Sequence, residues 1–113
     1  MTVATKLREL RLARKLTQHS LWALTEESSE VWGLSETAIA HYETGARVPT
    51  PRAVAALLHF LAQTEDEFHE VLELLAAESK DYVPLLALVK SGTWTRAQFE
   101  EWASSSPNLR TDR

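Results

Sequence analysis

Five threonine or serine side chains each stand directly before a stretch with helical apolar spacing. A hydroxyl at such a position can accept a hydrogen bond from a free amide of the first helical turn. These side chains belong to Thr17, Ser35, Thr50, Thr64 and Thr95. Between them, no segment alternates apolar and polar residues with a period of two. The sequence therefore predicts an all-α chain of short helices.

The first five predicted helices occupy residues 1–78. We expect them at about residues 2–15, from Gln18 to between Glu26 and Glu30, from Glu36 to about Glu43, from Pro51 onward and from Thr64 onward. Gly45 can adopt the positive φ that ends a helix, and Thr64 with Glu67 has the spacing of a capping box. The apolar residues expected on the buried faces are Leu7, Leu10, Leu12, Leu21, Leu24, Ala38, Ile39, Tyr42, Val54, Leu57, Leu58, Leu61, Phe68, Val71, Leu72 and Leu75.

A shorter segment follows at residues 79–106. Residues 82–89 are strongly apolar, and Thr95 with Gln98 forms a second capping box, which opens a last helix. Residues 107–113 are expected to fray. The expected fold is therefore all-α, a five-helix domain followed by a short two-helix C-terminal appendage.

The appendage is too small to enclose a core of its own. Its aromatic residues are Trp94, Phe99 and Trp102. These side chains either pack back against the five helices or meet a second copy of the chain. We expect the second arrangement, in which the appendage forms the interface of a homodimer.

The net charge of −4 is distributed unevenly along the chain. Residues 1–52 carry seven basic and six acidic side chains, whereas residues 53–113 carry five basic and ten acidic ones. A surface that binds nucleic acid needs a local positive face rather than a basic protein overall. The N-terminal half is therefore the part that can face nucleic acid, and the acidic second half is a candidate surface for a protein partner.

Several classes of function are disfavoured by the composition. The chain has no cysteine, which removes disulfides and thiolate chemistry. Its four histidines lack a recognised ligand spacing, and no nucleophile stands beside a base in a known motif, so we expect no metal, no cofactor and no enzymatic activity. No apolar run reaches the roughly 18 residues that span a bilayer, and the first ten residues lack the apolar stretch of a secretion signal. We expect a cytoplasmic, nucleoid-associated protein without membrane contact.

Two helices joined by a turn, the second of them capped by serine and ended by glycine, have a geometry that fits a major groove. The sequence resembles the lambda-repressor-like, or XRE, family of helix-turn-helix proteins. The resemblance rests on LRELRLARKLTQ (7–18), LSETAIAHYETGARVPTP (34–51), the leucine-rich residues 53–61 and TEDEF (64–68). It covers about two thirds of the chain and implies a DNA-binding domain over residues 1–78.

The resemblance implies a DNA-contact role for eight residues, which are Gln18, Ser35, Glu36, Thr37, His41, Thr44, Arg47 and Arg52. Gln18 would contact a phosphate or a base edge, the exposed positions of the third helix would read bases, and residues from Thr44 onward would reach the flanking backbone. Glutamate can accept from cytosine, threonine can touch the thymine methyl and histidine can donate to guanine. Glu36 could instead complement the dipole at a helix N-terminus. A salt bridge between Arg11 and Glu43, which locks the first helix onto the third, is also implied.

The sequence departs from the family between Gln18 and Gly33, where it is about seven residues longer, which is about two helical turns. Either the second helix is extended or the turn becomes a loop over residues 26–34. We expect a loop, because ESSE (27–30) is a poor helix interior. Its carboxylates would weaken DNA binding unless they point away from the DNA.

The function implied by the resemblance is that of a sequence-specific transcription regulator. A repressor that binds its operator as a homodimer is expected, because one recognition helix reads only a few base pairs. An alternative is a protein-interaction module, such as an antitoxin or a partner-binding regulator, in which DNA binding is weak. The small excess of basic residues and the acidic insertion favour that alternative.

Overall fold

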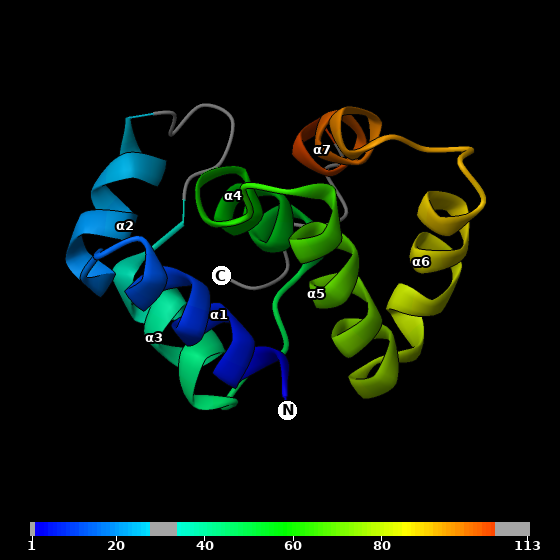
Figure 1. Ribbon diagram of the computed structural model, residues 1–113. Coiled ribbons are helices and arrows are strands. Elements are labelled where there is room, and N and C mark those ends of the chain that lie inside the picture. The colour runs from blue at the N-terminus through cyan, green and yellow to red at the C-terminus, as the bar shows by residue number, and fades with distance from the viewer. Residues whose placement is uncertain (1, 28–33, 106–113) are drawn as a thin grey trace.

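The computed structural model describes residues 2–27 and 34–105, and within them every regular element is helical (Figure 1). The elements are α1 (Val3–Ala13), α2 (Gln18–Glu26), α3 (Glu36–Thr44), α4 (Pro51–Leu61), α5 (Glu65–Glu78), the short 3₁₀ helix η1 (Lys80–Tyr82), α6 (Val83–Lys90) and α7 (Arg96–Ser105). The predicted all-α fold is confirmed. None of the helices in the described part of the chain is long and apolar enough to cross a membrane.

The expected caps account for where the helices begin. Thr17, Ser35, Thr50 and Thr64 each accept a hydrogen bond from the backbone amide three residues further on. Thr95 and Gln98 form a reciprocal capping box, with each side chain accepting from the other residue's amide. These bonds satisfy amides that the first turn of a helix leaves without intrahelical partners. Local hydroxyl chemistry therefore sets the N-termini, as the sequence predicts.

Two helix ends differ in detail from the prediction. The carboxylate of Glu67 accepts from the amide of Gln63 at 2.8 Å, so the capping box at Thr64 reaches one residue further back than expected. The first helix ends at Ala13 rather than near residue 15, because Lys15 adopts a positive φ of 59°. Gly45 ends α3 with a φ of 81°, which glycine adopts without the steric cost of a Cβ.

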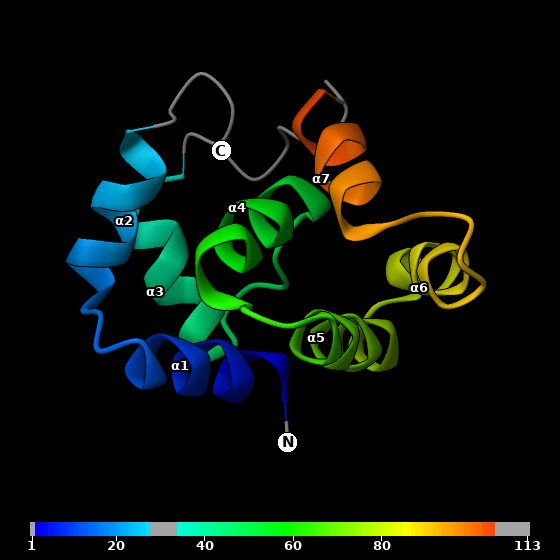
Figure 2. The same ribbon diagram turned by 45° about the horizontal axis from the view of Figure 1, so that its top comes forward.

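The core is built around α4, which runs through the middle of the molecule (Figure 2). All six residues from Ala53 to Leu58 are buried, although a surface helix normally keeps a polar face. This is possible because α1, α2 and α7 pack against different sides of α4. The predicted core residues are buried, apart from Leu24, which is half-buried, and Leu12.

Leu12 corrects one core prediction. Its side chain is 54 % exposed, whereas Leu7 and Leu10 are buried. Five residues of α-helix separate Leu12 from Leu7, and at 100° per residue this places the two side chains on opposing faces. Arg11, not Leu12, is the buried residue at the C-terminal end of α1.

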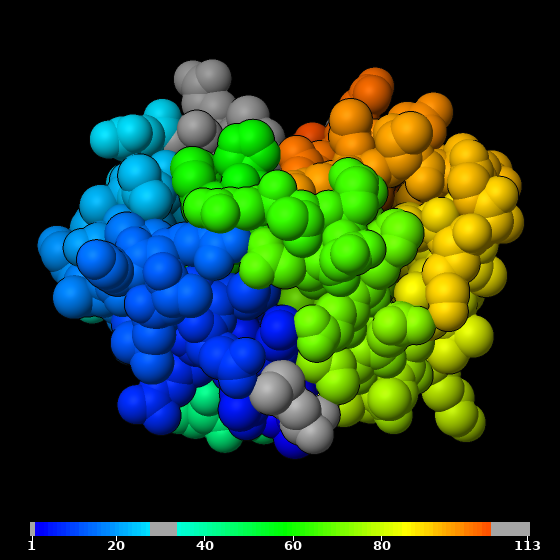
Figure 3. Space-filling view, viewed as in Figure 1, coloured from blue at the N-terminus to red at the C-terminus, as the bar shows by residue number. Residues whose placement is uncertain are grey.

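The C-terminal segment packs back onto the five helices. Phe99 and Ala103 of α7 are completely buried, and the Phe99 ring meets the ring of Phe68 edge-on, with 5.5 Å between centroids. Trp94 and Trp102 are half-buried beside them. The space-filling view shows α6 and α7 continuous with the surface of α4 and α5 (Figure 3). The aromatic residues expected at a dimer interface are thus largely used inside one chain.

Two arginines hold α7 against α4 in a reciprocal arrangement. Arg52, in the first turn of α4, donates to the carbonyl of Ser104 near the end of α7 at 2.6 Å. Arg96, the first residue of α7, donates to the carbonyl of Leu58 near the end of α4. The two helices are therefore antiparallel, and each cation sits at the negative end of the other helix's dipole.

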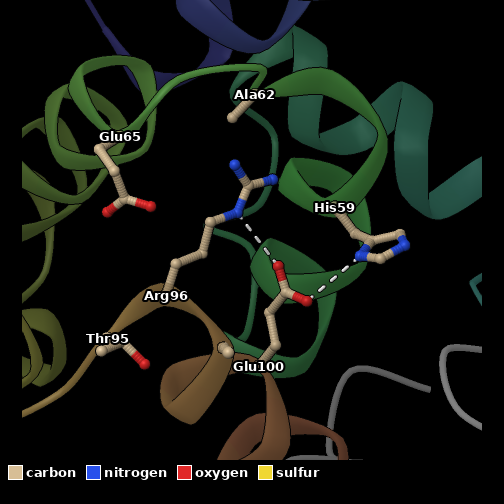
Figure 4. A pocket seen from close by; sticks show the side chains of 7 residues that line it. His59, Ala62, Glu65, Thr95, Arg96 and Glu100 are labelled. Carbon is tan, nitrogen blue, oxygen red and sulfur yellow. Dashed lines mark hydrogen bonds and ion pairs between the residues drawn. The ribbon is translucent and has the colours of Figure 1, made fainter.

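The Arg96 side chain also organises a shallow pocket of about 580 Å³ between α4, α5 and α7 (Figure 4). Glu100 lies between two basic side chains there, accepting from Arg96 Nε at 3.2 Å and lying 3.2 Å from the ring nitrogen Nδ1 of His59. The guanidinium also lies over the ring of Phe68, 5.7 Å from its centroid. The charged groups of Arg96 and Glu100 are thus satisfied by partners within the chain, which points to a structural junction.

Replacing Arg96 with methionine should lower the free energy of unfolding by roughly 2 kcal/mol, because a charged donor is lost while the apolar bulk is kept. The control is Lys90→Met, which breaks the exposed ion pair with Glu73 and should cost less than about 1 kcal/mol. Urea denaturation followed by circular dichroism measures both values. Equal losses in the two variants would contradict a special role for the arginine pair.

Candidate nucleic-acid interface

A buried ion pair fixes the third helix on the first. Arg11 Nε donates to Glu43 Oε2 at 2.7 Å, and Arg11 Nη2 donates to Glu43 Oε1 at 2.9 Å. The side chains are only 9 % and 4 % exposed. Arg11 Nη1 also donates to the carbonyl of Leu16, in the turn between α1 and α2, at 2.7 Å. The salt bridge implied by the family resemblance is thus confirmed.

Gln18 joins this network from the first turn of α2. Its amide nitrogen donates to Glu43 Oε1 at 3.2 Å, and its side chain is half-buried. One carboxylate therefore collects donors from α1 and α2 at the C-terminal end of α3. The side-chain amide predicted to contact DNA here orients α2 relative to α3, and a DNA contact by Gln18 stays a prediction.

The predicted base-reading residues lie on the outer side of α3. Ser35 caps the helix through its hydroxyl, at 3.0 Å from the amide of Ala38, and its residue surface is exposed. Glu36 and Thr37 are exposed, whereas His41 is half-buried. The opposite side of α3 is buried through Ala38, Ile39 and Tyr42. The helix therefore presents its N-terminal turn outward, as a helix that reads a major groove must.

An additional side chain meets this surface from α2. His19 Nδ1 lies 3.0 Å from Glu36 Oε1, and the His19 ring packs beside the Trp22 ring with 5.3 Å between centroids. The side chains of His19 and Glu36 are 70 % and 48 % exposed. His19 was not among the predicted site residues. The sequence signal that could have identified it is its position directly after Gln18, in the first turn of α2.

The residues after α3 divide into two groups. Thr44 is exposed, with its hydroxyl donating to the carbonyl of His41 at 3.2 Å, and Arg47 is exposed in the following loop. Arg52, by contrast, is directed toward α7 through its bond to Ser104. The structure thus brings Thr44 and Arg47 near the end of α3, but it does not bring Arg52 to this surface.

Much of the positive charge of α1 is neutralised by α5. Lys6 Nζ lies 2.8 Å from Glu70, and Arg14 Nη2 lies 2.8 Å from Glu67. The hydrogen bond that Lys6 donates to Glu70 stabilises the charged ammonium and raises the pKa of Lys6. Burial opposes ionisation of Glu67, but the bonds from the Gln63 amide and Arg14 outweigh it and lower the pKa of Glu67.

Within the described part of the chain, at least five of the ten lysine and arginine side chains pair with carboxylates, which reduces the positive charge left for a polyanion. Arg8 and Lys15 are exposed, and neither forms an ion pair with another described residue. Within the described part of the chain, no group of three acidic or histidine side chains could hold a metal ion.

The loop expected over residues 26–34 falls mostly on residues 28–33, which lie outside the described residues. The described residues show where the helix before this segment ends: α2 ends at Glu26, within the predicted range.

Replacing Glu43 with glutamine should lower the free energy of unfolding by about 3 kcal/mol. The substitution keeps the shape of the side chain but leaves the buried Arg11 guanidinium without a counter-charge. Glu9→Gln is the control, because the Glu9 side chain is 54 % exposed and lies 3.7 Å from Lys6, and its loss should cost less than about 1 kcal/mol. Chemical denaturation measures both, and a Glu43 effect as small as that of Glu9 would show that the pair does not lock the helices.

Comparison with known proteins agrees with this arrangement of helices. A family model described as a helix-turn-helix domain matches residues 2–71, which is more than half of the chain and includes α1 to α4 with the first half of α5. Searches of curated proteins and of solved structures each found no match. The match is consistent with the lambda-repressor-like resemblance of the sequence. The chain belongs to the helix-turn-helix domain family.

Proposed function

We propose that this protein is a sequence-specific transcription regulator that represses by occupying an operator as a homodimer. The observation that carries the proposal is the exposed first turn of α3, which the buried Arg11–Glu43 pair fixes relative to α1. A recognition element must be held in one orientation to discriminate base edges. Helix-turn-helix family membership favours DNA as the partner, and for a DNA-bound protein we expect a location in the cytoplasm with the nucleoid.

Repression is favoured over activation by what each requires. An operator that overlaps a promoter is blocked by occupancy alone, whereas activation needs a further contact to the transcription machinery. The acidic helix α5 is a poor candidate for that contact, because most of its carboxylates are engaged within the chain. Glu67, Glu70 and Glu73 form ion pairs with basic side chains, and Glu78 accepts from the amide of Val3 at 2.7 Å.

The homodimer is supported by the outer face of α6. This helix contains no charged residue before Lys90, yet only Leu85 and Val89 are buried. Val83, which is 52 % exposed, Pro84 and Ala87 face outward. A helix that is apolar all round is normally buried. Since α6 lies on the opposite side of the molecule from α2 and α3, a second copy packed there leaves the recognition helix open (Figures 1 and 2).

A partner-binding regulator is the second candidate, and the same α6 face favours it. A different protein could cover that face, with DNA binding weakened by the shortage of unpaired cations. The two proposals differ in what the purified chain does alone. A homodimer assembles without help and selects DNA with two-fold symmetry, whereas a partner-binding module does neither.

Selection from a random DNA pool tests DNA recognition. We expect enrichment of a palindromic or pseudo-palindromic sequence, and Thr37→Ala should weaken binding to it about tenfold, the effect of losing one base contact. The matched control is Thr93→Ala, an exposed threonine beyond α6, which should leave affinity unchanged. The logarithm of affinity should fall with the logarithm of salt with a shallow slope, because few phosphate contacts are available. If the selection enriches no sequence, the result contradicts the proposal.

Introducing a charge on the outer face of α6 tests the dimer. Val83→Asp should convert the wild-type dimer to a monomer, because a carboxylate buried at an apolar interface is strongly unfavourable. Leu12→Asp is the control, since Leu12 is equally exposed but lies on α1. Sedimentation equilibrium reports the mass of each variant, and a monomeric wild type or an unaltered Val83→Asp dimer would count against this interface.

A further inference from the structure

We propose that His19 contacts DNA and that His19 and Glu36 act together as one recognition unit. This inference rests on the proposed function, because it identifies a further contact within the same DNA-binding surface. The pair joins the first turn of α2 to the first turn of α3. It also adds a residue from the helix that precedes the recognition helix.

The placement of His19 suits a contact residue. Its neighbour Gln18 is directed inward to Glu43, whereas the His19 side chain is 70 % exposed and is steadied by the Trp22 ring. A surface histidine without a partner would sample several rotamers. Here the bond to Glu36 and the aromatic contact restrict it beforehand, which lowers the entropic cost of ordering it against DNA.

The bond to Glu36 determines which hydrogen-bonding atom of His19 is available to DNA. An ionised carboxylate only accepts hydrogen bonds, so the proton of a neutral His19 ring resides on Nδ1. The Nε2 lone pair is then free to accept, as are the remaining lone pairs of the carboxylate. The pair therefore presents acceptors to DNA. In the major groove, the complementary donors are the N4 amino group of cytosine and the N6 amino group of adenine.

Protonation would change both the charge and the hydrogen-bonding pattern of the pair. Imidazole is the side chain whose charge ordinarily changes between pH 5 and 8. With a neutral ring the pair carries one negative charge, which phosphates repel. With a protonated ring the pair is neutral overall, and Nε2–H can donate to phosphate or to guanine. Affinity for DNA should therefore rise as the pH falls, while the preference for an amino group should weaken.

Among the described residues, Glu36 is the one charged group that contacts His19. From α2 itself the neighbours are Gln18, which bonds to Glu43, and Trp22. From α3 the facing charge is Glu36. The helix α4 also packs on α2, but its basic residues Arg52 and His59 bond to Ser104 and Glu100 of α7.

The test compares DNA selected by wild type, His19→Gln and Glu36→Gln at pH 8 and pH 6. Wild type should enrich cytosine or adenine at one position of each half-site at pH 8. It should bind that site about tenfold more tightly at pH 6, the effect expected of a gained polar contact. His19→Gln should lose the pH response, and Glu36→Gln should relax the preference at that position.

The matched control is His69→Gln, which removes another surface histidine paired with a glutamate. His69 Nε2 lies 3.8 Å from Glu65, on α5, and the His69 side chain is 38 % exposed. This variant should keep the wild-type pH response. Thermal melting should show that His19→Gln folds as wild type does, since the side chain is largely outside the core.

The outcomes separate the two proposals. If wild type selects no sequence at either pH, the proposed function fails, and the inference fails with it. If wild type selects a sequence but His19→Gln keeps the same affinity, base preference and pH response, the His19 inference fails alone. A pH response that His69→Gln abolishes equally would also overturn it.

Discussion

The buried ion pair between Arg11 and Glu43 determines how the parts of this fold are oriented. Glu43 accepts from Arg11 on α1 and from Gln18 on α2, while Arg11 also binds the carbonyl of Leu16 between those helices. Burying such a pair carries a desolvation penalty, so the pair adds little net stability. Its main effect is that it permits only one relative orientation of the two helices. Because a planar guanidinium must meet the carboxylate with two parallel bonds, the angle between α1 and α3 is set where the recognition helix ends.

The pairing of basic side chains within the chain also determines the charge of the candidate nucleic-acid interface. Lys6 and Arg14 are neutralised by α5, Arg11 by α3, and Arg52 is engaged by α7. Under the proposed function, this pairing leaves less charge on the described residues for non-specific attraction to phosphates. Discrimination would then depend on short-range contacts from a rigid surface, which the paired and capped first turns of α2 and α3 can provide.

The sequence was informative where local chemistry decides the structure. Helix N-termini followed from hydroxyl caps such as Ser35, because the cap and its amide lie three residues apart. The Arg11–Glu43 pair followed from the family resemblance. The contact of Arg52 with α7 could not be predicted from the sequence. Its partner is the backbone carbonyl of Ser104, which lies 52 positions away and carries no sequence signal. The structure thus adds a tertiary contact of Arg52 that no local pattern reveals, and the DNA contact implied by the resemblance stays a prediction.

The docking of α7 explains why α6 is left with an apolar outer face. A helix with six consecutive buried residues, as α4 has from Ala53 to Leu58, needs neighbours on several sides, and α7 supplies one through Phe99 and the two arginine contacts. The connecting helix α6 is consequently held against α5, with one face inward through Leu85 and Val89. Solvent alone would favour polar residues on the other face. The proposed homodimer would account for this apolar composition, while the aromatic residues first expected at the dimer interface pack α7 against the other helices of the same chain.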